Sequence, residues 1–306
     1  MQTTEHGRGI LLSGGSGLIG SALRRSFATR GVPVLRLVRE AAAGEDELTW
    51  NPDALPAIEA EAELDGCEAA IHLSGASIAG QKWTPERIKE LTHSRVNSTL
   101  ALTRLLASLR HPPRTLLVAS AVGIYGNRGN EILDETSAPG AGFLANLCRE
   151  WEAAAQPARD AGIRVAHLRF GVVLSPASGA LAKMLPLFRL GLGGPLGSGR
   201  HWMSWIGLDD AVGAMLYALQ TPAVEGPVNL TAPNPVTNAE FTRLLAHALH
   251  RPAFLPAPAF ALRLAFGRMA DEALLASTRA MPSRLLTHGF QFRHSTLHEA
   301  LRAALG

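Results

Sequence analysis

The sequence predicts an α/β protein, in which a Rossmann-type, doubly wound parallel sheet is joined to a smaller, mainly helical substrate lobe. Short apolar runs alternate with amphipathic segments through the first two thirds of the chain, and a glycine-rich turn directly follows the first run. Runs that are apolar on both faces are typical of parallel strands covered by helices. Their repeated alternation with helical segments favours the doubly wound arrangement.

The expected elements follow one another in the order that such a sheet requires. We expect strands at residues 9–13, 32–38, 69–74, 115–120, 163–168 and 228–230. Apolar residues at helical spacing, or frequent alanines, predict helices at residues 18–30, 87–109, 148–161 and 211–219. Asp209 and Asp210 precede the last helix, and we expect them to be its N-cap pair without a catalytic role.

A change in composition after residue 171 predicts two units. We assign residues 9–175 to the Rossmann domain, to which residues 205–235 return. Residues 176–204 and 236–306 would form the smaller C-terminal lobe. This lobe begins with a segment that leads into a glycine cluster at 191–199, and its tail is rich in proline, alanine and leucine.

Composition and charge exclude several classes of protein. Hydrophobic residues make up 47% of the chain and charged residues 18%, which is ample apolar material for a packed core. The net charge is only +3 and like charges do not form long runs, so we expect no nucleic-acid partner. No stretch approaches the ~18 apolar residues that span a bilayer, so we expect no membrane partner.

Two further observations predict a cytoplasmic protein. Residues 1–9 are polar and lack the apolar core of a secretory signal. Cys67 and Cys148 have the spacing of neither a metal site nor a disulfide framework, so we expect two buried thiols. The oligomeric state is left open between a monomer and a homodimer.

The strongest local signal is the glycine-rich turn SGGSGLIG at residues 13–20. Gly14, Gly17 and Gly20 follow an apolar strand and open an amphipathic helix. In a dinucleotide-binding turn, the first glycine allows the tight turn, the second lets the backbone approach a pyrophosphate, and the third lets the helix pack on the strand. The helix N-terminus then faces the phosphates. We therefore expect a bound dinucleotide here, the alternative being a tight turn without a ligand.

The residue after the second strand indicates which dinucleotide binds. NAD-binding units often place an acid about 20 residues after the glycines, where it holds the ribose 2′-hydroxyl. Here Arg39 follows the strand, and a guanidinium can pair with a 2′-phosphate through two hydrogen bonds. We therefore predict NADP(H). A register shift of one residue would put Glu40 at this position, and a solvated surface arginine is the alternative interpretation.

Several motifs along the chain point to one family. They are the glycine turn, VR at 38–39, HLSGA at 72–76, SRVNST at 94–99, GVVL at 171–174, FRLGLGGPLGSG at 188–199, WI with DD at 205–210, NAEF at 238–241 and the tail at 251–292. With these motifs the chain resembles the extended and atypical short-chain dehydrogenase/reductases, and most closely the NAD(P)-dependent epimerase/dehydratase subgroup with a short C-terminal domain of unknown function. The resemblance covers nearly the whole chain.

The resemblance implies cofactor contacts at the matching positions. The implied pyrophosphate contacts are Gly14, Gly17, Leu18 and Ile19. The implied adenosine and ribose contacts are His72, Leu73 and Ser74. The residues implied to face the rest of NADP(H) are Arg39, Lys89, Ser94 and Val172. From the residues alone, His72 is otherwise a packed histidine at a strand end, and Lys89 equally well lies on a solvated helix face.

The catalytic pair of the wider superfamily is missing. Related enzymes carry Tyr-x-x-x-Lys, in which the tyrosine transfers a proton and the lysine lowers the tyrosine pKa. The only tyrosines are Tyr125 and Tyr217, and neither is followed four residues later by lysine. We place the two missing positions at Phe143 or Leu144 and at Leu147 or Cys148.

Polar residues near the expected site are the remaining candidates for catalysis. Ser120 matches the catalytic serine of the superfamily, and it could hydrogen-bond a substrate carbonyl or cap a turn. Tyr125 could act as a substitute acid or pack in the core. Arg169 could pair with an anionic substrate or form a salt bridge with Glu152 or Asp134.

The segment 191–205 is the best candidate for the substrate side. Its glycines would allow a lid, and Arg200, His201, Trp202 and Trp205 offer cationic and stacking groups, although it could simply connect the lobes. His247 and His250 lie three residues apart without an evident third ligand, so we predict no metal site.

The sequence thus predicts an NADP(H)-binding protein of the epimerase family, acting as an oxidoreductase or epimerase on an unknown small polar substrate. The alternative is a non-catalytic NADP(H)-binding sensor or scaffold protein, because the cofactor residues persist where the proton-transfer pair is missing.

Overall fold

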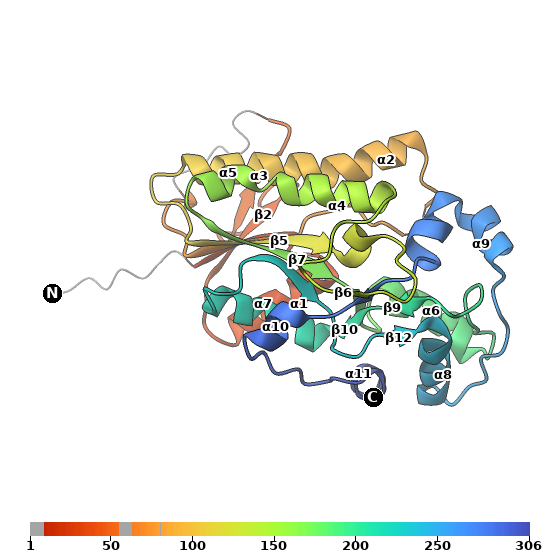
Figure 1. Cartoon of the computed structure of the whole chain (residues 1–306). Helices are drawn as coiled ribbons and strands as arrows, with labels where there is room; N and C mark the ends of the chain where they lie inside the picture. Colours follow the sequence, from red (N-terminus) through yellow and green to blue (C-terminus); the bar gives the residue numbers. More distant parts are fainter. Residues whose placement is uncertain (1–8, 55–62, 80) are drawn as a thin grey trace.

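A seven-stranded parallel sheet forms the centre of the molecule. The structure, a computed structural model, describes residues 9–54, 63–79 and 81–306. The sheet order is β11–β7–β5–β4–β1–β2–β3, and all neighbouring strands run parallel. The strand order changes direction between β1 and β4, which is the switch point where doubly wound sheets bind ligands. The predicted fold class is therefore confirmed (Figure 1).

The sheet contains every strand that the sequence predicts, with small shifts at the ends. Its strands are β1 (Ile10–Ser13), β2 (Val34–Val38), β3 (Glu47–Thr49), β4 (Ala69–His72), β5 (Thr115–Ala121), β7 (Arg164–Phe170) and β11 (Gly226–Leu230). The sequence did not predict β3, a short edge strand that follows β2 without an apolar run. Residues 1–8, on which the prediction of no secretory signal largely rests, lie outside the described residues.

Helices cover both faces of the sheet, which explains why its strands are apolar on both sides. On one face lie α1 (Leu18–Ala28) and α7 (Leu208–Gln220). On the other face lie α2 (Pro85–Thr92), α3 (Ser98–Ser108), α4 (Phe143–Ala153) and α5 (Gln156–Asp160) (Figure 1). Buried cores fill both interfaces, with Leu23 and Phe27 in the first and Leu106 and Trp151 in the second.

The long helix expected at 87–109 is a helical stretch with a π-helical turn inside it. The turn η2 (His93–Asn97) separates α2 from α3. At the start of α2, the Thr84 hydroxyl accepts a hydrogen bond from the Arg87 backbone N at 3.2 Å, as is usual for an N-cap. Turns of this π type are frequent at functional sites, and η2 holds residues of the candidate site.

The helix expected at 148–161 differs from the prediction. It already begins at Phe143, and α4 is separated from α5 by Ala154 and Ala155. A tertiary contact explains the early start, because the Leu144 backbone N donates to Glu272 Oε2 at 2.8 Å. That contact satisfies an N–H group of the first turn that no local side chain caps.

The expected N-cap role of Asp209 and Asp210 is wrong. Gly207 is the N-cap residue of α7, and both aspartates lie in the first turn, where their charge suits the helix dipole. Asp210 is buried, and its carboxylate accepts hydrogen bonds from the backbone N of Arg293 at 2.7 Å and of His294 at 3.0 Å. It therefore anchors the C-terminal tail.

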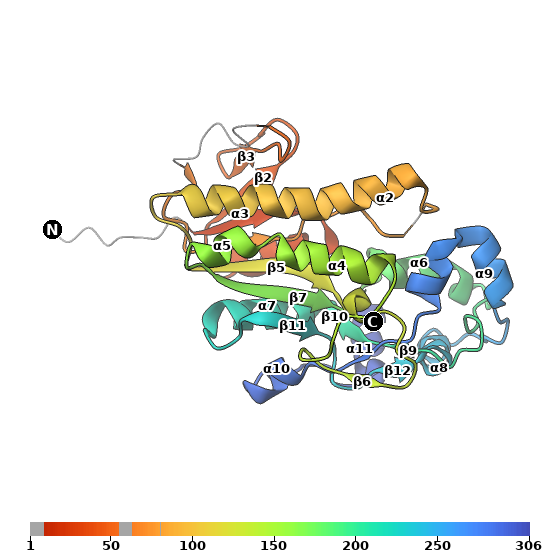
Figure 2. The same ribbon diagram turned by 45° about the horizontal axis from the view of Figure 1, so that its top comes forward.

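The smaller lobe lies at the carboxyl ends of the sheet strands (Figure 2). Its helices are α6 (Gly179–Arg189), α8 (Asn238–Ala248), α9 (Ala259–Phe266), the π-helical turn η4 (Ala270–Leu274) and α11 (Leu297–Leu305). Short paired strands connect it with the main domain. β8 (Val172–Leu174) pairs with β10 (Trp205–Gly207), and β9 (Trp202–Met203) pairs with β12 (Val236–Thr237). In the same way, β6 (Ile132–Leu133) pairs with β13 (Arg279–Ala280). A short 3-10 turn, η3 (Val122–Tyr125), follows β5.

The C-terminal tail does not stay within this lobe. The helix α10 (Ser283–Thr287) contacts β11, and Leu285 and Phe290 join the core beneath the main sheet. The chain then returns to the lobe, where Leu297 and Leu301 of α11 are buried. The assignment of all of 236–306 to the lobe therefore missed a crossing of the tail.

Two smaller observations concern the cysteines and the membrane. Cys67 and Cys148 are both buried, as predicted, and neither forms a disulfide. Within the described ranges, every helix is too short or too polar to cross a membrane.

Candidate functional site

The glycine turn is too crowded for side chains at two of its three positions. Gly14 has φ +72°, a left-handed conformation that favours glycine. A Cβ atom at Gly20 would lie 2.2 Å from the Gly14 carbonyl oxygen, whereas one at Gly17 would meet the same oxygen at an ordinary 3.4 Å. Packing therefore requires glycine at 14 and 20. At 17, packing leaves room for a side chain, and glycine there would let the backbone approach a ligand.

The N-terminus of α1 presents open backbone N–H groups at this turn. Its N-cap residue is Gly17, no side chain caps it, and its first turn contains no acid. The N–H groups and the positive end of the helix dipole are therefore available to an anion. This geometry fits the pyrophosphate of a dinucleotide.

Arginines lie beside the turn. Arg39 directly follows β2, as predicted, and is exposed. Arg36 is held by Asp46, with Nε 2.9 Å from Oδ2. Arg24 of α1, which sequence analysis missed, also lies here, because a Cβ atom at Gly15 would be 3.3 Å from its Cδ. In the described part of the chain, neither Arg24 nor Arg39 takes part in an ion pair.

A cavity of about 500 Å³ opens beside the turn, across the carboxyl ends of β1, β4, β5 and β7. It continues past α4 to two segments near the lobe, 196–204 and 272–278. The predicted site residues that line it are Gly14, Gly17, Leu18, Ile19, Leu73, Ser120 and Val172. The predicted residues that do not line it are Arg39, His72, Ser74, Lys89, Ser94 and Tyr125.

His72 is a packed histidine at a strand end, which is the alternative interpretation that the sequence left open. It is fully buried, with Nδ1 2.5 Å from Ser13 Oγ and Nε2 3.3 Å from Ser98 Oγ. Burial lowers the pKa of the ring to about 4, so His72 is neutral at neutral pH. Only its backbone, at the end of β4, can face a ligand.

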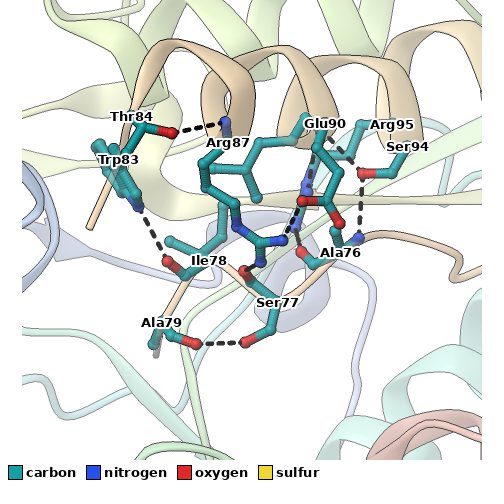
Figure 3. Close-up of polar contacts among 11 residues, drawn as sticks. Ala76, Ser77, Ile78, Ala79, Trp83, Thr84, Arg87, Glu90, Ser94 and Arg95 are labelled. Atoms are coloured by element: carbon teal, nitrogen blue, oxygen red, sulfur yellow. Dashed lines mark hydrogen bonds and ion pairs between the residues drawn. The ribbon is translucent and has the colours of Figure 1, made fainter. Parts of the chain in front are cut away.

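The turn η2 holds the loop that follows β4 (Figure 3). Ser94 Oγ accepts a hydrogen bond from Ala76 N at 3.1 Å, and Arg95 donates to Ala76 O at 2.8 Å. Arg87 donates to the Ser77 carbonyl oxygen in the same loop. Ser94 thus positions the loop and does not face the cavity. Lys89 is exposed on α2, and its contact with the cofactor stays a prediction.

Arg95 lines the cavity, and sequence analysis missed it. It is 8% exposed, its guanidinium lies 5.1 Å from the Trp151 ring centroid, and no ion pair of the described residues includes it. Burial lowers its pKa to about 10, so it keeps its charge at neutral pH. A buried charge without a counter-ion is costly, and a bound anion would remove that cost. The SRVNST motif contains Arg95 but does not reveal where its side chain points.

Ser120 lines the cavity at the end of β5, but its proton is already engaged. Its hydroxyl donates to Glu152 Oε1 at 2.7 Å, and Arg169 holds the same carboxylate through Nε at 2.8 Å and Nη2 at 2.9 Å. Burial alone would raise the pKa of Glu152, but the hydrogen bonds and charge of Arg169 outweigh it and lower the pKa. Ser120 therefore offers the cavity an acceptor. In this arrangement the Ser120 proton points at Glu152 and not at a substrate carbonyl, which was one of its two open roles. Arg169 forms the salt bridge with Glu152.

Tyr125 is a core residue, so its predicted role as a substitute acid is wrong. It is fully buried in η3 and does not line the cavity. Its hydroxyl lies 2.9 Å from Asp134 O and 2.8 Å from Asn229 Oδ1, and it accepts from Arg169 Nη1 at 3.0 Å. Burial raises its pKa. The polar partners of the hydroxyl are thus all within the protein.

Most of the positions to which we assigned the Tyr-x-x-x-Lys pair line the cavity. Leu144, Leu147 and Cys148 of α4 all line it. Burial raises the pKa of the Cys148 thiol to about 12, so this group stays protonated and is a poor proton acceptor at neutral pH. The helix that would carry the pair is therefore in place, but apolar side chains and a thiol occupy it.

The segment 191–205 supplies one wall of the cavity, through Leu196, His201, Trp202, Met203 and Ser204. Of the other residues predicted here, Arg200 is exposed and Trp205 is fully buried in the lobe core. The segment 272–278 forms a further wall. No motif with known chemistry marked that segment in the sequence.

The histidines of α8 have a neighbour that the sequence did not indicate. The rings of His247 and His298 lie 6.0 Å apart, and those of His247 and His250 lie 6.3 Å apart. Within residues 9–54, 63–79 and 81–306, no three His, Cys, Asp or Glu side chains are arranged to hold a metal ion.

Known proteins match this chain over most of its length. The NAD dependent epimerase/dehydratase family matches residues 10–230, and a domain of unknown function (DUF1731) matches residues 257–304. An epimerase family protein of Mycobacterium bovis is 47% identical over 292 residues, which are 95% of this chain and 96% of that protein.

Two solved structures support the same relationship. The human epimerase family protein SDR39U1 (isoform 2), crystallised with NADPH, has a TM-score of 0.89 at 35% identity, covering 96% of this chain and 98% of that chain. A nucleoside-diphosphate sugar epimerase from Corynebacterium glutamicum has a TM-score of 0.78 at 36% identity, covering 97% of this chain and 58% of that chain. The chain therefore belongs to the NAD dependent epimerase/dehydratase family, as its motifs indicated.

Proposed function

We propose that the protein binds NADP(H) and uses it as an oxidoreductase or epimerase on a small molecule held between the main sheet and the C-terminal lobe. The observation that carries this proposal is the cavity that runs from the glycine turn to the lobe. A cofactor at the turn and a second molecule at the lobe would meet in this one space. The human relative crystallised with NADPH supports the choice of cofactor.

The residues around the turn fit an anionic dinucleotide with an extra phosphate. The open N-terminus of α1 would hold the pyrophosphate at Gly17, Leu18 and Ile19. Arg39 would pair with the 2′-phosphate. Arg95 adds a buried positive charge at the same cavity, and Val172 would lie near the nicotinamide. When bound, this cofactor supplies or accepts a hydride.

The cofactor would supply the hydride, and the role of the protein side chains would be to position groups around the nicotinamide. Glu152 and Arg169 orient Ser120, so that its oxygen can accept a hydrogen bond from a hydroxyl or amide of a bound molecule. Ser120 is the predicted catalytic residue that lies at the cavity. It acts in this proposal as an acceptor, not as a donor to a carbonyl.

Glycine substitutions test the cofactor site and separate binding from folding. In Gly17→Ala the new Cβ has room within the protein but occupies the space of the approaching pyrophosphate. We expect the fold to persist and NADPH affinity, measured by fluorescence titration, to fall at least about tenfold. Gly20→Ala should instead lose stability, because its Cβ would collide with the Gly14 oxygen. Unchanged NADPH binding by a folded Gly17→Ala variant would refute the proposal.

A non-catalytic NADP(H) sensor is the second candidate. It rests on our assignment of the proton-transfer pair to Phe143 or Leu144 and to Leu147 or Cys148, and it is supported by the apolar residues and the thiol that line the cavity there. The two functions are separated by following oxidation of bound NADPH with carbonyl compounds and with nucleotide sugars. Turnover that Ser120→Ala abolishes supports the enzyme, whereas tight binding without turnover in either set supports the sensor.

A further inference from the structure

The wall of the cavity on the lobe side is largely apolar. Its apolar members include Met184, Leu196, Met203 and Leu274. Among the described residues of the lobe, no lysine or arginine lines the cavity. The Arg279 guanidinium stacks on the Trp202 ring, 4.0 Å from its centroid, and does not line the cavity. This wall therefore offers no positive charge to a ligand.

Most polar side chains on this wall already have partners within the protein. Trp202 Nε1 donates to Asn130 Oδ1 at 3.0 Å. Ser204 Oγ donates to Thr278 O at 2.9 Å, and Thr278 Oγ1 donates to Gly126 O at 3.1 Å. The donors of these three side chains are thus used inside the protein, and none is left for a phosphate.

The charged side chain on this wall is an acid. Glu272 accepts from the Leu144 backbone N at 2.8 Å, and its other oxygen pairs with Arg268 on the outside of the lobe. Because Arg268 balances its charge, Glu272 offers no attraction to an anionic group.

His201 is the exception among the polar groups. It lines the cavity, and its Nε2 is buried with no hydrogen-bond partner among the described residues. Burial lowers the pKa of its ring, so His201 is neutral at neutral pH. A neutral imidazole can exchange one hydrogen bond with a ligand oxygen, but it brings no charge to balance a phosphate.

We propose that the substrate is an uncharged, largely apolar carbonyl compound or the corresponding alcohol, with its oxygen bound to His201, and not a nucleoside diphosphate sugar. This inference rests on the proposed NADP(H)-dependent function. The carbonyl carbon gains the hydride of NADPH and the C=O π bond breaks, while the neutral imidazole of His201 donates a hydrogen bond to the oxygen. The oxygen gains its proton from water, whose hydroxide passes to the solvent, giving the alcohol and NADP⁺.

The contrast with a nucleotide sugar follows from charge. A diphosphate is anionic, and burying it without cationic or N–H partners costs several kcal/mol. The lobe wall provides an acid, apolar side chains and one neutral imidazole instead. The sequence predicted a small polar substrate and offered Arg200 among the cationic and stacking groups of the segment 191–205, but that arginine is exposed.

The test starts from the full-length protein saturated with NADPH. An initial titration with NADPH alone checks the proposed function, because absent binding would remove that proposal together with this inference. The loaded protein is then titrated calorimetrically with cyclohexanone, acetophenone and octanal, and separately with UDP-glucose and UDP-glucuronate. We expect saturable binding and NADPH oxidation with at least one apolar carbonyl and no binding of either UDP-sugar. Saturable binding of a UDP-sugar, or no binding of any apolar carbonyl at millimolar concentration, overturns the inference.

Variants assign the contact to His201. His201→Phe keeps a ring at this position but removes the hydrogen bond, so affinity for the carbonyl compound should fall about tenfold. Turnover should fall about a hundredfold, because the developing negative charge on the oxygen loses its hydrogen-bond donor. NADPH affinity should not change. His247→Phe places the same substitution at an exposed histidine of α8 and should leave all three quantities unchanged. An equal loss of carbonyl affinity and turnover in both variants, or no loss of either in His201→Phe, contradicts the assignment.

Discussion

Polar residues around the cavity divide into those whose hydrogen bonds are completed within the protein and those left available. Ser120 gives its proton to Glu152, and the hydroxyl of Tyr125 is surrounded by protein partners. His201 Nε2 instead has no hydrogen-bond partner among the described residues. Arg95 donates to the carbonyl oxygens of Leu91 and Ala76, but its charge has no counter-ion among the described residues. Because unsatisfied buried polar groups are costly, these two residues indicate where a ligand binds.

Removal of the Arg39 guanidinium should change cofactor preference. In Arg39→Ala, NADPH affinity should fall about ten- to a hundredfold, because a charge-assisted pair with the 2′-phosphate contributes about 1.5–3 kcal/mol. NADH affinity should stay the same, since NADH has no 2′-phosphate. The matched control is Arg25→Ala, which removes the guanidinium of an exposed arginine in α1. Fluorescence titrations with both nucleotides measure the effect, and equal losses for NADPH and NADH would contradict the prediction.

Burial of His72 should make the folded state sensitive to mild acid. Its pKa is about 4 in the folded protein and about 6.5 in an unfolded chain. Between these values the unfolded chain binds a proton that the folded protein does not, so stability falls as the pH drops below about 6.5. From this residue, about 2 kcal/mol should be lost by pH 5.

Urea unfolding at pH 7 and pH 5 measures this loss. His72→Asn, which cannot titrate in this range, should be less stable at pH 7 but should lose about 2 kcal/mol less on acidification. An identical pH dependence in both proteins would show that His72 is not the titrating group.

At the scale of single elements, tertiary contacts set the boundaries that local sequence left undetermined. The helix α4 begins at Phe143 because Glu272, far along the chain, accepts a hydrogen bond from Leu144 N. The π turn η2 similarly coincides with contacts to the loop after β4, where Ser94 and Arg95 bind Ala76 (Figure 3). Both sets of hydrogen bonds place residues at the cavity.

Loss of the cap from Glu272 should destabilise the protein. Glu272→Ala leaves Leu144 N without its acceptor, and caps of this kind contribute about 1 kcal/mol. Glu272→Gln keeps an acceptor oxygen and loses only the charge toward the half-exposed Arg268, so it should cost less than about 0.5 kcal/mol. Chemical denaturation compares the two variants, and equal stabilities would contradict the capping role.

At the scale of the whole molecule, the chain crosses repeatedly between the main domain and the lobe. Residues 205–230 return to the main domain as β10, α7 and β11, of which β11 joins the main sheet, and the tail passes from η4 through α10 to α11. Leu285 of α10 is fully buried in the same core as Leu12 and Ile71. The two units therefore share buried contacts, and we expect them to unfold together.

Substitution of Leu285 tests this shared core. Leu285→Ala should lower the free energy of unfolding by about 2–5 kcal/mol, as expected for a fully buried leucine. The neighbouring Leu286 is 45% exposed, so Leu286→Ala should cost far less. Far-ultraviolet circular dichroism and tryptophan fluorescence should give coincident unfolding curves. Separate transitions would show that the lobe unfolds independently.

The sequence determined the parallel sheet, the glycine turn, the position of Arg39 and the family, because these depend on local apolar patterns and on glycines whose geometry is fixed by near neighbours. It also located Ser120 and the segment 191–205 at the cavity. Only the tertiary structure decided which side chains face that cavity. His72 and Tyr125 point into the core, whereas Arg95 and Glu272 reach the cavity. The physical reason is that the direction and hydrogen-bond partners of a side chain depend on residues distant in sequence, which local periodicity does not record.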